Sequence, residues 1–343
     1  MTHKLHNKSM AKSEIRQNRL TEEWVIFAPA RSKRPHDFIK EKPDGAPLPE
    51  YDPDCPFCPG NEDKLSEIFF ETKGKGKLPW LTRVIPNKYP ALTPTGDAKR
   101  HVRGHQIAMP GYGHHEVVIE TPVHNRPVAA MSLPEVSSVI ETYHMRYRFL
   151  TSDRKDMVVI IFRNHGERAG TSVSHPHSQI IAVGATPRHI RYRQHIAEGH
   201  YDRWGTCLLC DVVASEVEAG TRVLFENDNF WAFIPYAAEV PFQVWIVPRK
   251  HQADFGDVSE EEKSDLAAML LKVLAILHAK LKNPAYNYVI HSAGTLKSGE
   301  PHLHWYLDIR PRLITRAGFE IGSGIGINPS VPEKDAEFLR QSD

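Results

Sequence analysis

The sequence has little of several features that would assign it to a simple functional class. Its 343 residues include 43 Lys and Arg against 42 Asp and Glu, and the net charge of +1 offers no general attraction to nucleic acid or anionic membranes. Its longest apolar runs, such as Met157–Phe162, are far too short to span a bilayer. The polar segment Met1–Lys12 has no signal-peptide core. We therefore expect a cytoplasmic protein that binds neither nucleic acid nor membrane.

Cysteine is also scarce. Four cysteines in a chain of this length do not make a disulfide framework, but they form two pairs of identical spacing, Cys55–Cys58 and Cys207–Cys210. Histidine, in contrast, is unusually frequent, with 20 residues. Paired cysteines together with many histidines raise the question of which ligand these side chains bind.

The histidines reveal an internal repeat. Three pairs are each separated by 127 residues: His124 and His251, His175 and His302, and His177 and His304. Equal separations of this kind are hard to attribute to chance and indicate a duplicated module. The two cysteine pairs are 152 residues apart, so the first half contains an insertion between its cysteines and its first histidine of the repeat.

Both halves predict the same order of elements. Short apolar runs typical of strands occur in each: Glu116–Glu120, Met157–Phe162 and Ile180–Val183, then Phe230–Ile234, Phe242–Val247, Tyr286–Ile290 and Trp305–Ile309. A capping-box motif precedes one long helix per half, from Ser132 to about Leu150 and from Ser259 to about Leu281. The predicted fold class is α+β, with duplicated modules that each combine a mainly antiparallel sheet with one long helix.

The predicted domains are an N-terminal half, residues 1–190, and a C-terminal half, residues 191–343. The segment 184–206 is rich in His and Arg without clear periodicity, and we expect it to link the halves and cover one of them. The first 14 residues and about the last 10 are expected to be loosely ordered.

The cysteines and repeated histidines are typical zinc ligands, because thiolates and imidazoles supply four donors around a tetrahedral ion. The candidate ligands form two sets: Cys55, Cys58, His124 and His175, and then Cys207, Cys210, His251 and either His302 or His304. Buried inert thiols and a redox-active pair are the alternatives. A redox pair usually opens a helix in a βαβ unit, and that context is missing. Each ion, bound by four protein donors, would be structural.

A candidate nucleophile follows the first set. Five small or polar residues form a loop whose N–H and hydroxyl groups can surround a phosphate: Gly166, Gly170, Thr171, Ser172 and Ser174. His175 and His177 are expected to face the same side of one strand, and Gln179 continues that face. With His175 on zinc, the imidazole of His177 can attack phosphorus to form a phosphoramidate. The alternative is that His177 is another ligand or a core residue. The second half has no matching loop or Gln, so it is expected to be degenerate.

Four segments carry a more specific resemblance: Trp24–Pro35, Cys55–Glu62, Asn87–Leu92 and Asn164–Gln179. Over about residues 14–330 the chain resembles the galactose-1-phosphate uridylyltransferase branch of the histidine-triad superfamily. The resemblance implies two histidine-triad-like modules and a ping-pong transfer of a nucleoside monophosphate through the second histidine of the His-Pro-His motif, which is His177. It also implies Zn²⁺, a homodimer and substrates that are a nucleotide sugar (UDP- or ADP-hexose) and a hexose-1-phosphate or phosphate.

Roles for individual residues follow from the same resemblance. His177 and Gln179 would be catalytic, and zinc would be bound by the first ligand set. Substrate contacts would come from seven residues: Arg31, Arg34, Asn87, Asn164, Gly170, Ser172 and Gln179. Related nucleotide hydrolases have a histidine at the position of Gln179. Since an amide cannot supply a proton to a leaving group but can hydrogen-bond phosphoryl oxygens, a transferase is favoured over a hydrolase.

The transferred base is less strongly indicated. The resemblance to the uridylyltransferases favours uridylyl transfer, but the chain departs from them at two places. They usually have Asn-Asp-Phe where this chain has Asn87-Lys88-Tyr89. They often have a glutamate that binds a second metal, iron, where an ungapped alignment gives Arg193. The Cys207–Cys210 pair, His251 and the later Gly-Phe-Glu-Ile-Gly run are similar to ADP-glucose phosphorylases, which carry two zinc sites. Adenylyl transfer from ADP-glucose to phosphate is therefore the alternative. A double zinc module for nucleic acid is disfavoured by the balanced charge.

Overall fold

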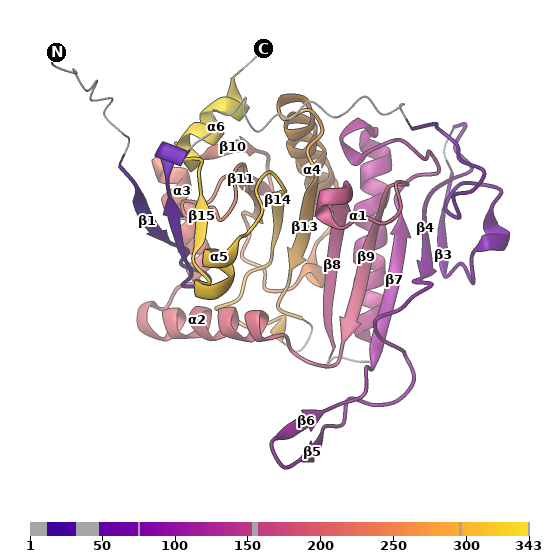
Figure 1. Cartoon of the computed structure of the whole chain (residues 1–343), viewed down its shortest axis with the longest axis horizontal. Coiled ribbons are helices and arrows are strands. Elements are labelled where there is room, and N and C mark those ends of the chain that lie inside the picture. Colours follow the sequence, from indigo (N-terminus) through magenta and orange to yellow (C-terminus); the bar gives the residue numbers. More distant parts are fainter. Residues whose placement is uncertain (1–11, 32–47, 75, 153–156, 295–296, 342–343) are drawn as a thin grey trace, which may run out of the picture.

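The computed structural model describes residues 12–31, 48–74, 76–152, 157–294 and 297–341. Ten strands form one continuous sheet in the order β10-β11-β12-β14-β13-β8-β9-β7-β4-β3, and all neighbours are antiparallel (Figure 1). In that order the strands are Val223–Glu226, Phe230–Phe233, Val244–Pro248, Tyr306–Pro311, Tyr286–His291, Val158–His165, His177–Val183, Gly113–Ile119, Trp80–Pro86 and Phe70–Lys73.

The sheet is symmetric about its centre. Five strands of each half are arranged in mirrored order, and the halves meet where β13 pairs with β8, for example Val289 with Phe162. The inner strands β8 and β13 therefore leave no open edge between the halves, because each strand hydrogen-bonds to the other. This arrangement confirms the predicted α+β fold of duplicated, mainly antiparallel modules.

One long helix per half covers the same face of the sheet (Figure 1). These helices are α1 (Leu133–Ser152) and α4 (Glu260–Lys280), and they contact each other and the strands beneath them. Ser259 and Glu262 form the predicted capping box, and Ser132 donates its backbone N–H and its hydroxyl to Glu135. The apolar side chains between helices and sheet form the main core. Two smaller apolar clusters cover the opposite face, one around Trp245 and Val247 and one around Val117 and Ile119.

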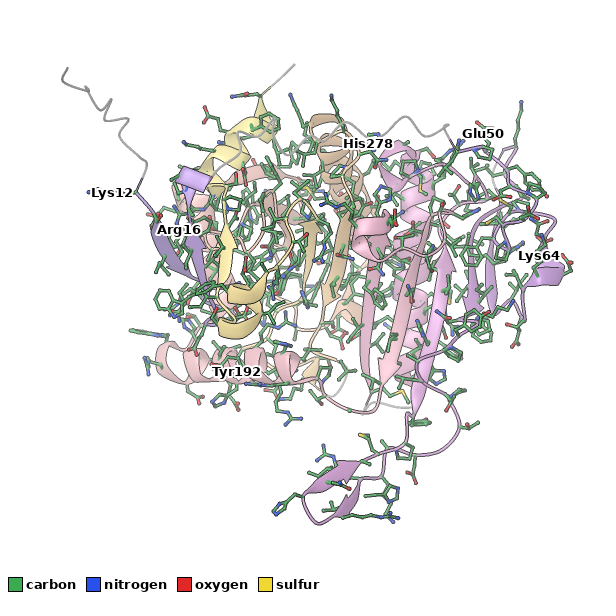
Figure 2. The ribbon with its side chains drawn as sticks, in the orientation of Figure 1. Lys12, Arg16, Glu50, Lys64, Tyr192 and His278 are labelled. Carbon is green, nitrogen blue, oxygen red and sulfur yellow. The ribbon has the colours of Figure 1, made fainter. Side chains whose placement is uncertain are left out.

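A second, three-stranded sheet lies at the side of the C-terminal half. It contains β1 (Glu14–Gln17), β2 (Trp24–Phe27) and β15 (Gly326–Asn328), with β15 parallel to β2. Arg16 on β1 (Figure 2) is buried and donates to the Glu333 carboxylate at 2.9 Å and to the Tyr236 carbonyl at 3.0 Å. These bonds attach the N-terminal strand to the end of the chain.

The remaining elements are short or peripheral. A two-stranded hairpin, β5 (His101–Arg103) with β6 (Gln106–Ala108), projects from the body (Figure 1). The others are η1 (Pro29–Arg31), η3 (Glu62–Lys64), η4 (Val128–Ala130), η5 (Glu167–Ala169), η6 (Phe255–Asp257), α3 (Leu208–Ala219) and α5 (Gly318–Ser323). Within the described ranges, no helix has both the length and the apolarity needed to cross a membrane.

Two segments differ from the prediction. The linker contains a helix, α2 (Arg188–Trp204), which has no fully buried residue, so its sequence shows no apolar periodicity. It does cover the second half, since Arg193 bonds side chains at the ends of β13 and β14. The end of the chain is not loose: α6 (Pro332–Arg340) buries Ala336 and Leu339 against the core.

Candidate active site

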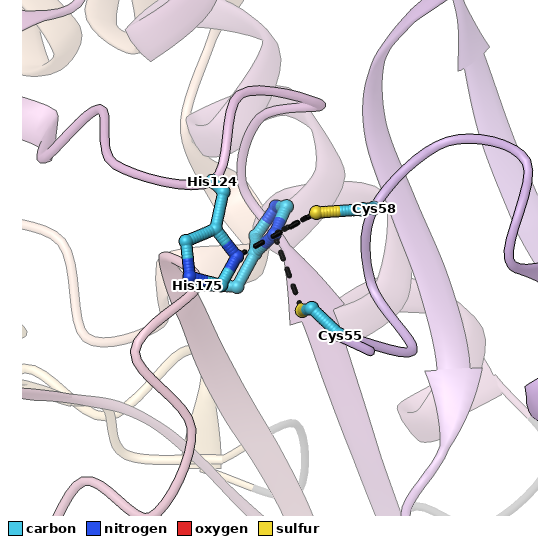
Figure 3. A group of neighbouring side chains, drawn as sticks. All are labelled: Cys55, Cys58, His124 and His175. Carbon is cyan, nitrogen blue, oxygen red and sulfur yellow. Dashed lines mark hydrogen bonds between the residues drawn. The ribbon is translucent and has the colours of Figure 1, made fainter. Parts of the chain in front are cut away.

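The first cysteine pair meets two histidines in a buried cluster (Figure 3). Cys55 and Cys58 lie on a turn before η3, His124 follows β7, and His175 lies two residues before the start of β9. The Sγ atom of Cys58 is 3.5 Å from Nδ1 of His124 and 3.6 Å from Nδ1 of His175, and Sγ of Cys55 is 3.7 Å from the latter. Four donors from three separate segments therefore converge on one point.

These separations fit a metal ion. Zinc bonds of about 2.3 Å to sulfur and about 2.0 Å to nitrogen, at tetrahedral angles, place S and N about 3.6 Å apart. His175 donates its Nε2–H to the carbonyl of Thr121 at 2.7 Å, so its Nδ1 lone pair faces the sulfurs. Burial lowers the pKa of His175 to about 4 and raises the pKa of Cys55 to about 11. A cation among the donors would supply the positive charge that a buried thiolate needs.

The second cluster contains Cys207, Cys210, His251 and His304, and its ligand atoms also lie within 4.8 Å of one another. Cys207 is the N-cap of α3, and Cys210 lies in the first helical turn. Sγ of Cys210 is 3.4 Å from Nδ1 of both histidines. A hydrogen bond from Cys210 lowers the pKa of the Cys207 thiol. The cluster thus has the same donor chemistry as the first.

The structure places His304, and not His302, in this cluster. His302 lies instead with Nδ1 3.6 Å from a carboxylate oxygen of Glu300. The reason is that β9 begins at His177 and β14 at Tyr306, so the strands are related by 129 residues although the histidine motifs repeat every 127. His304 is therefore the structural counterpart of His175.

The same register places Tyr306 at the position of His177. The Tyr306 hydroxyl accepts a hydrogen bond from Arg193 at 3.0 Å, and the same guanidinium lies 3.0 Å from Nδ1 of His291. A phenol held by an arginine stands where the first half has an imidazole. This difference gives a physical basis to the expectation that the second half is degenerate.

His177 is held in one tautomer. Its Nδ1 lies 2.8 Å from the carbonyl oxygen of His175, which can only accept, so Nδ1 carries the proton and Nε2 carries the lone pair. The side chain is only 6% exposed, and burial lowers its pKa, which favours the neutral ring. Phe57 contacts the ring edge-on with centroids 5.5 Å apart. His175 lies in a bend before the strand, so the prediction that one strand carries both imidazoles is wrong.

A cleft of about 1000 Å³ opens beside His177. Among the predicted residues, Asn164 and Ser172 line it, and Gly170, in the left-handed region with φ of 91°, ends η5 just before the lining residue Thr171. The second half contributes 281–285 and 312–313. The lining also includes four basic side chains that sequence analysis did not identify: Arg163, Arg168, Lys282 and Arg312. Arg163 is neutralised by Glu120, and Glu167 also lines the cleft, but Arg168, Lys282 and Arg312 still leave it net positive. A positively charged cleft of this size fits a phosphorylated ligand.

Two further predicted residues, Asn87 just after β4 and Gln179 on β9, meet at one side chain. Both contact the ring of His115 on β7, which the sequence did not single out as functional. Arg31 is the last residue of η1, and Arg34 lies outside the described residues. The structure therefore brings Asn87 and Gln179 together and places Asn164 and Ser172 with His177.

Below His177 lies a fully buried ion pair. Glu120 and Arg163 are 0% and 1% exposed, and their closest oxygen and nitrogen are 2.8 Å apart. Tyr143 donates to Glu120 at 3.1 Å, and Arg163 donates to Tyr286 at 3.0 Å. The backbone N–H of Glu120 also donates to the carbonyl of Pro176, between the two histidines. The sequence signal for this network was weak: one charged residue beside an apolar strand.

Comparisons with known proteins agree with this geometry. The family model "Galactose-1-phosphate uridyl transferase, N-terminal domain" matches residues 4–187, and the corresponding C-terminal model matches residues 189–325. An ADP-glucose phosphorylase of Arabidopsis thaliana is 33% identical over 333 residues, which cover 96% of this chain and 92% of the relative. A galactose-1-phosphate uridylyltransferase of Thermotoga maritima is 29% identical over 342 residues, 96% of this chain and 98% of the relative.

Solved structures show the same similarity. The crystal structure of the Arabidopsis thaliana ADP-glucose phosphorylase with bound ADP-glucose matches with a TM-score of 0.81 and 32% identity, and the match covers 97% of this chain and 99% of that chain. A uridylyltransferase structure matches with a TM-score of 0.73 and 26% identity over 96% of this chain and 97% of that chain. Both matches extend through the two halves.

Proposed function

This chain belongs to the galactose-1-phosphate uridylyltransferase family, and we propose that it moves a nucleoside monophosphate between a nucleotide sugar and a hexose-1-phosphate or phosphate through His177. The enzyme is of the hexose-1-phosphate uridylyltransferase type. The observation that carries the proposal is the imidazole of His177, held with its Nδ1 proton on a carbonyl beside a basic cleft.

Two displacements at phosphorus complete the reaction. First, Nε2 of His177 attacks the phosphorus that bears the nucleoside, the bond from that phosphorus to the bridging oxygen breaks, and the sugar phosphate leaves with the electron pair. Then a phosphate oxygen of the acceptor attacks the same phosphorus, and the N–P bond breaks. The carbonyl of His175 stabilises the ring's Nδ1 proton while positive charge develops on the imidazole.

The surrounding residues suit transfer to phosphate rather than to water. Gln179 follows His177 on the same face of β9, and its amide can hydrogen-bond phosphoryl oxygens without donating a proton to a leaving group. Asn164 and the loop with Gly170 and Ser172 would contact the phosphates, and Arg31 and Arg34 would add charge. Lys282 and Arg312 extend the basic lining toward an acceptor.

Zn²⁺ is our proposal for both cysteine–histidine clusters. The ion would act structurally, holding four donors in place. The first cluster would bear on catalysis indirectly, because His175 offers its ring Nδ1 to the cluster and its backbone carbonyl to His177. In the second, Cys207, Cys210, His251 and His304 would be the ligands.

Uridylyl transfer with a hexose-1-phosphate acceptor is the first candidate. Adenylyl transfer from an ADP-sugar to phosphate is the second, and it is favoured by the donor set of the second cluster and by the similarity to the ADP-glucose phosphorylase. Comparing turnover of UDP-glucose plus galactose-1-phosphate with turnover of ADP-glucose plus phosphate decides between them. A hydrolase would instead release nucleoside monophosphate steadily without an acceptor.

Covalent labelling tests the shared mechanism. The protein is incubated with UDP-glucose or ADP-glucose labelled at the nucleoside-bearing phosphate, and the adduct is mapped by proteolysis. We expect acid-labile label on His177, none in His177→Ala, and normal labelling in the control His105→Ala, whose residue lies on the exposed β5–β6 turn. Parent-level sugar-phosphate exchange by His177→Ala would overturn the proposal.

The organisation of the protein follows the same proposal. Residues 1–190 would form the catalytic half and 191–343 the degenerate half, a division supported by Tyr306 at the position of the nucleophile. A homodimer is supported by the exposed apolar side chains of Trp24, Phe319 and Ile321 and is tested by sedimentation. A cytoplasmic location would keep the four thiols reduced.

A further inference from the structure

His115 on β7 is hydrogen-bonded on both ring nitrogens. Its Nδ1 lies 3.1 Å from the backbone nitrogen of Ala91, and its Nε2 lies 2.7 Å from Oε1 of Gln179. The amide nitrogen of Asn87 is 3.2 Å from the same Nε2. This arrangement connects His115 to Gln179, which lies two residues after His177 on β9.

The contact with Ala91 determines the tautomer of His115. A backbone N–H can only donate, so Nδ1 must accept with its lone pair, and the proton of the neutral ring lies on Nε2. Nε2–H then needs an acceptor. Asn87 cannot turn its amide oxygen toward the ring, because that oxygen already accepts from the N–H of Tyr89 at 2.9 Å. The oxygen of Gln179 is therefore the acceptor.

This bond determines the orientation of the Gln179 amide. With this tautomer the Asn87 NH₂ group, 3.2 Å from Nε2, is a second donor and cannot satisfy Nε2–H. If the Gln179 amide flipped, Nε2–H would face two NH₂ groups and no acceptor. The stable arrangement has the oxygen toward β7 and the NH₂ group free to donate elsewhere. Gln179 and His177 lie two residues apart on one strand and so share a face of the sheet.

We propose that His115 is a positioning residue that orients the amide of Gln179 so that its NH₂ group donates to the phosphoryl group carried by His177. The inference rests on the proposed function, since Gln179 acts only if the nucleotidyl group is transferred through His177. His115 itself touches neither substrate nor phosphorus. Its effect on the reaction passes entirely through Gln179.

Two substitutions separate the bonds of His115. In His115→Asn the short amide can accept from the N–H of Ala91 but cannot reach Gln179. In His115→Gln the longer amide places a donor where Nε2 was. We expect His115→Asn to slow transfer and His115→Gln to restore most of the rate. A merely structural histidine would not show this order, because Asn preserves the local backbone bond.

The experiment measures single-turnover labelling of His177 at saturating nucleotide sugar by rapid quench. Gln179→Ala should be about 100-fold slower than the parent, as for loss of one donor to a developing oxyanion. His115→Asn should be about tenfold slower, with substrate affinity unchanged. The double variant His115→Asn/Gln179→Ala should be no slower than Gln179→Ala. Thermal melting of each variant identifies those that fold.

The outcomes separate the two proposals. If Gln179→Ala is slow but His115→Asn matches the parent, or if their effects multiply in the double variant, His115 does not act through Gln179 and the inference fails alone. If the parent protein acquires no label on His177, the proposed function fails. Parent-like rates for Gln179→Ala contradict the role of Gln179 and this inference with it.

Discussion

Replacing Glu120 with Gln removes one charge from the ion pair with Arg163 beneath His177. Glu120 and Arg163 are 0% and 1% exposed, so water cannot solvate the guanidinium once its partner is neutral. Loss of one partner of a buried pair costs about 3–5 kcal/mol. Because Arg163 keeps its bond to Tyr286 at 3.0 Å, we expect the lower end, about 3 kcal/mol.

Urea unfolding followed by tryptophan fluorescence measures this loss as a lower transition midpoint at unchanged slope. The matched control is Glu226→Gln. Its partner Arg249 lies 2.7 Å away, but the two side chains are 58% and 35% exposed. A pair in water contributes less than about 1 kcal/mol. Equal losses in both variants would refute the reasoning, because burial would then not determine the energy of the pair.

A second change checks the cause of the loss. In Glu120→Gln/Arg163→Met the unbalanced charge is absent, so part of the stability lost in the single variant should return. If the double variant has a lower free energy of unfolding than Glu120→Gln, lost packing and not the unbalanced charge explains the result.

Further predictions concern the metals and pH. Cys58→Ser should lower bound zinc by about one ion per chain by atomic absorption and lower the melting temperature; unchanged metal content contradicts the first site. His304→Ala should lose the second ion and His302→Ala should keep it. The reverse result would show that His302, the residue 127 positions after His175, is the ligand. Burial raises the pKa of Asp335 to about 7, so its carboxyl ionises in the unfolded chain first, and stability due to this residue falls as pH rises from about 4 to 7. Urea unfolding of Asp335→Asn at several pH values should show a smaller fall in the free energy of unfolding between about pH 4 and 7 than the parent shows. An equal fall in both proteins would contradict the prediction.

The sequence predicted the elements that carry strong local patterns. Ser259 and Glu262 marked the start of α4, because a capping box satisfies the first free N–H groups of a helix wherever it occurs. The helix α2 was not predicted because none of its residues is fully buried, so its sequence has no apolar face that repeats with the helical period. The helix α6 was missed for a different reason: a position near the end of the chain says nothing about the contacts that bury Leu339.

The candidate site was predicted to a similar extent. The motif from Asn164 to Gln179 predicted His177 as a nucleophile beside a phosphate-binding loop, since chemistry restricts the residue types near a reacting phosphate, and this stays a prediction. His115 and Arg163 carried no such signal, because the contacts of a histidine or arginine inside a strand depend on neighbours on other strands. The basic contribution of Lys282 and Arg312 to the cleft likewise depends on how the halves meet.

The amino-acid order by itself predicted the duplication, the two groups of cysteine and histidine candidates and the proposal of His177 as the nucleophile, because these depend on residue type and spacing. Only the tertiary structure decided that His304 and not His302 joins the second cluster. Two residues of difference in where a strand begins change which side chain reaches the cysteines, and that starting point is set by pairing with distant strands.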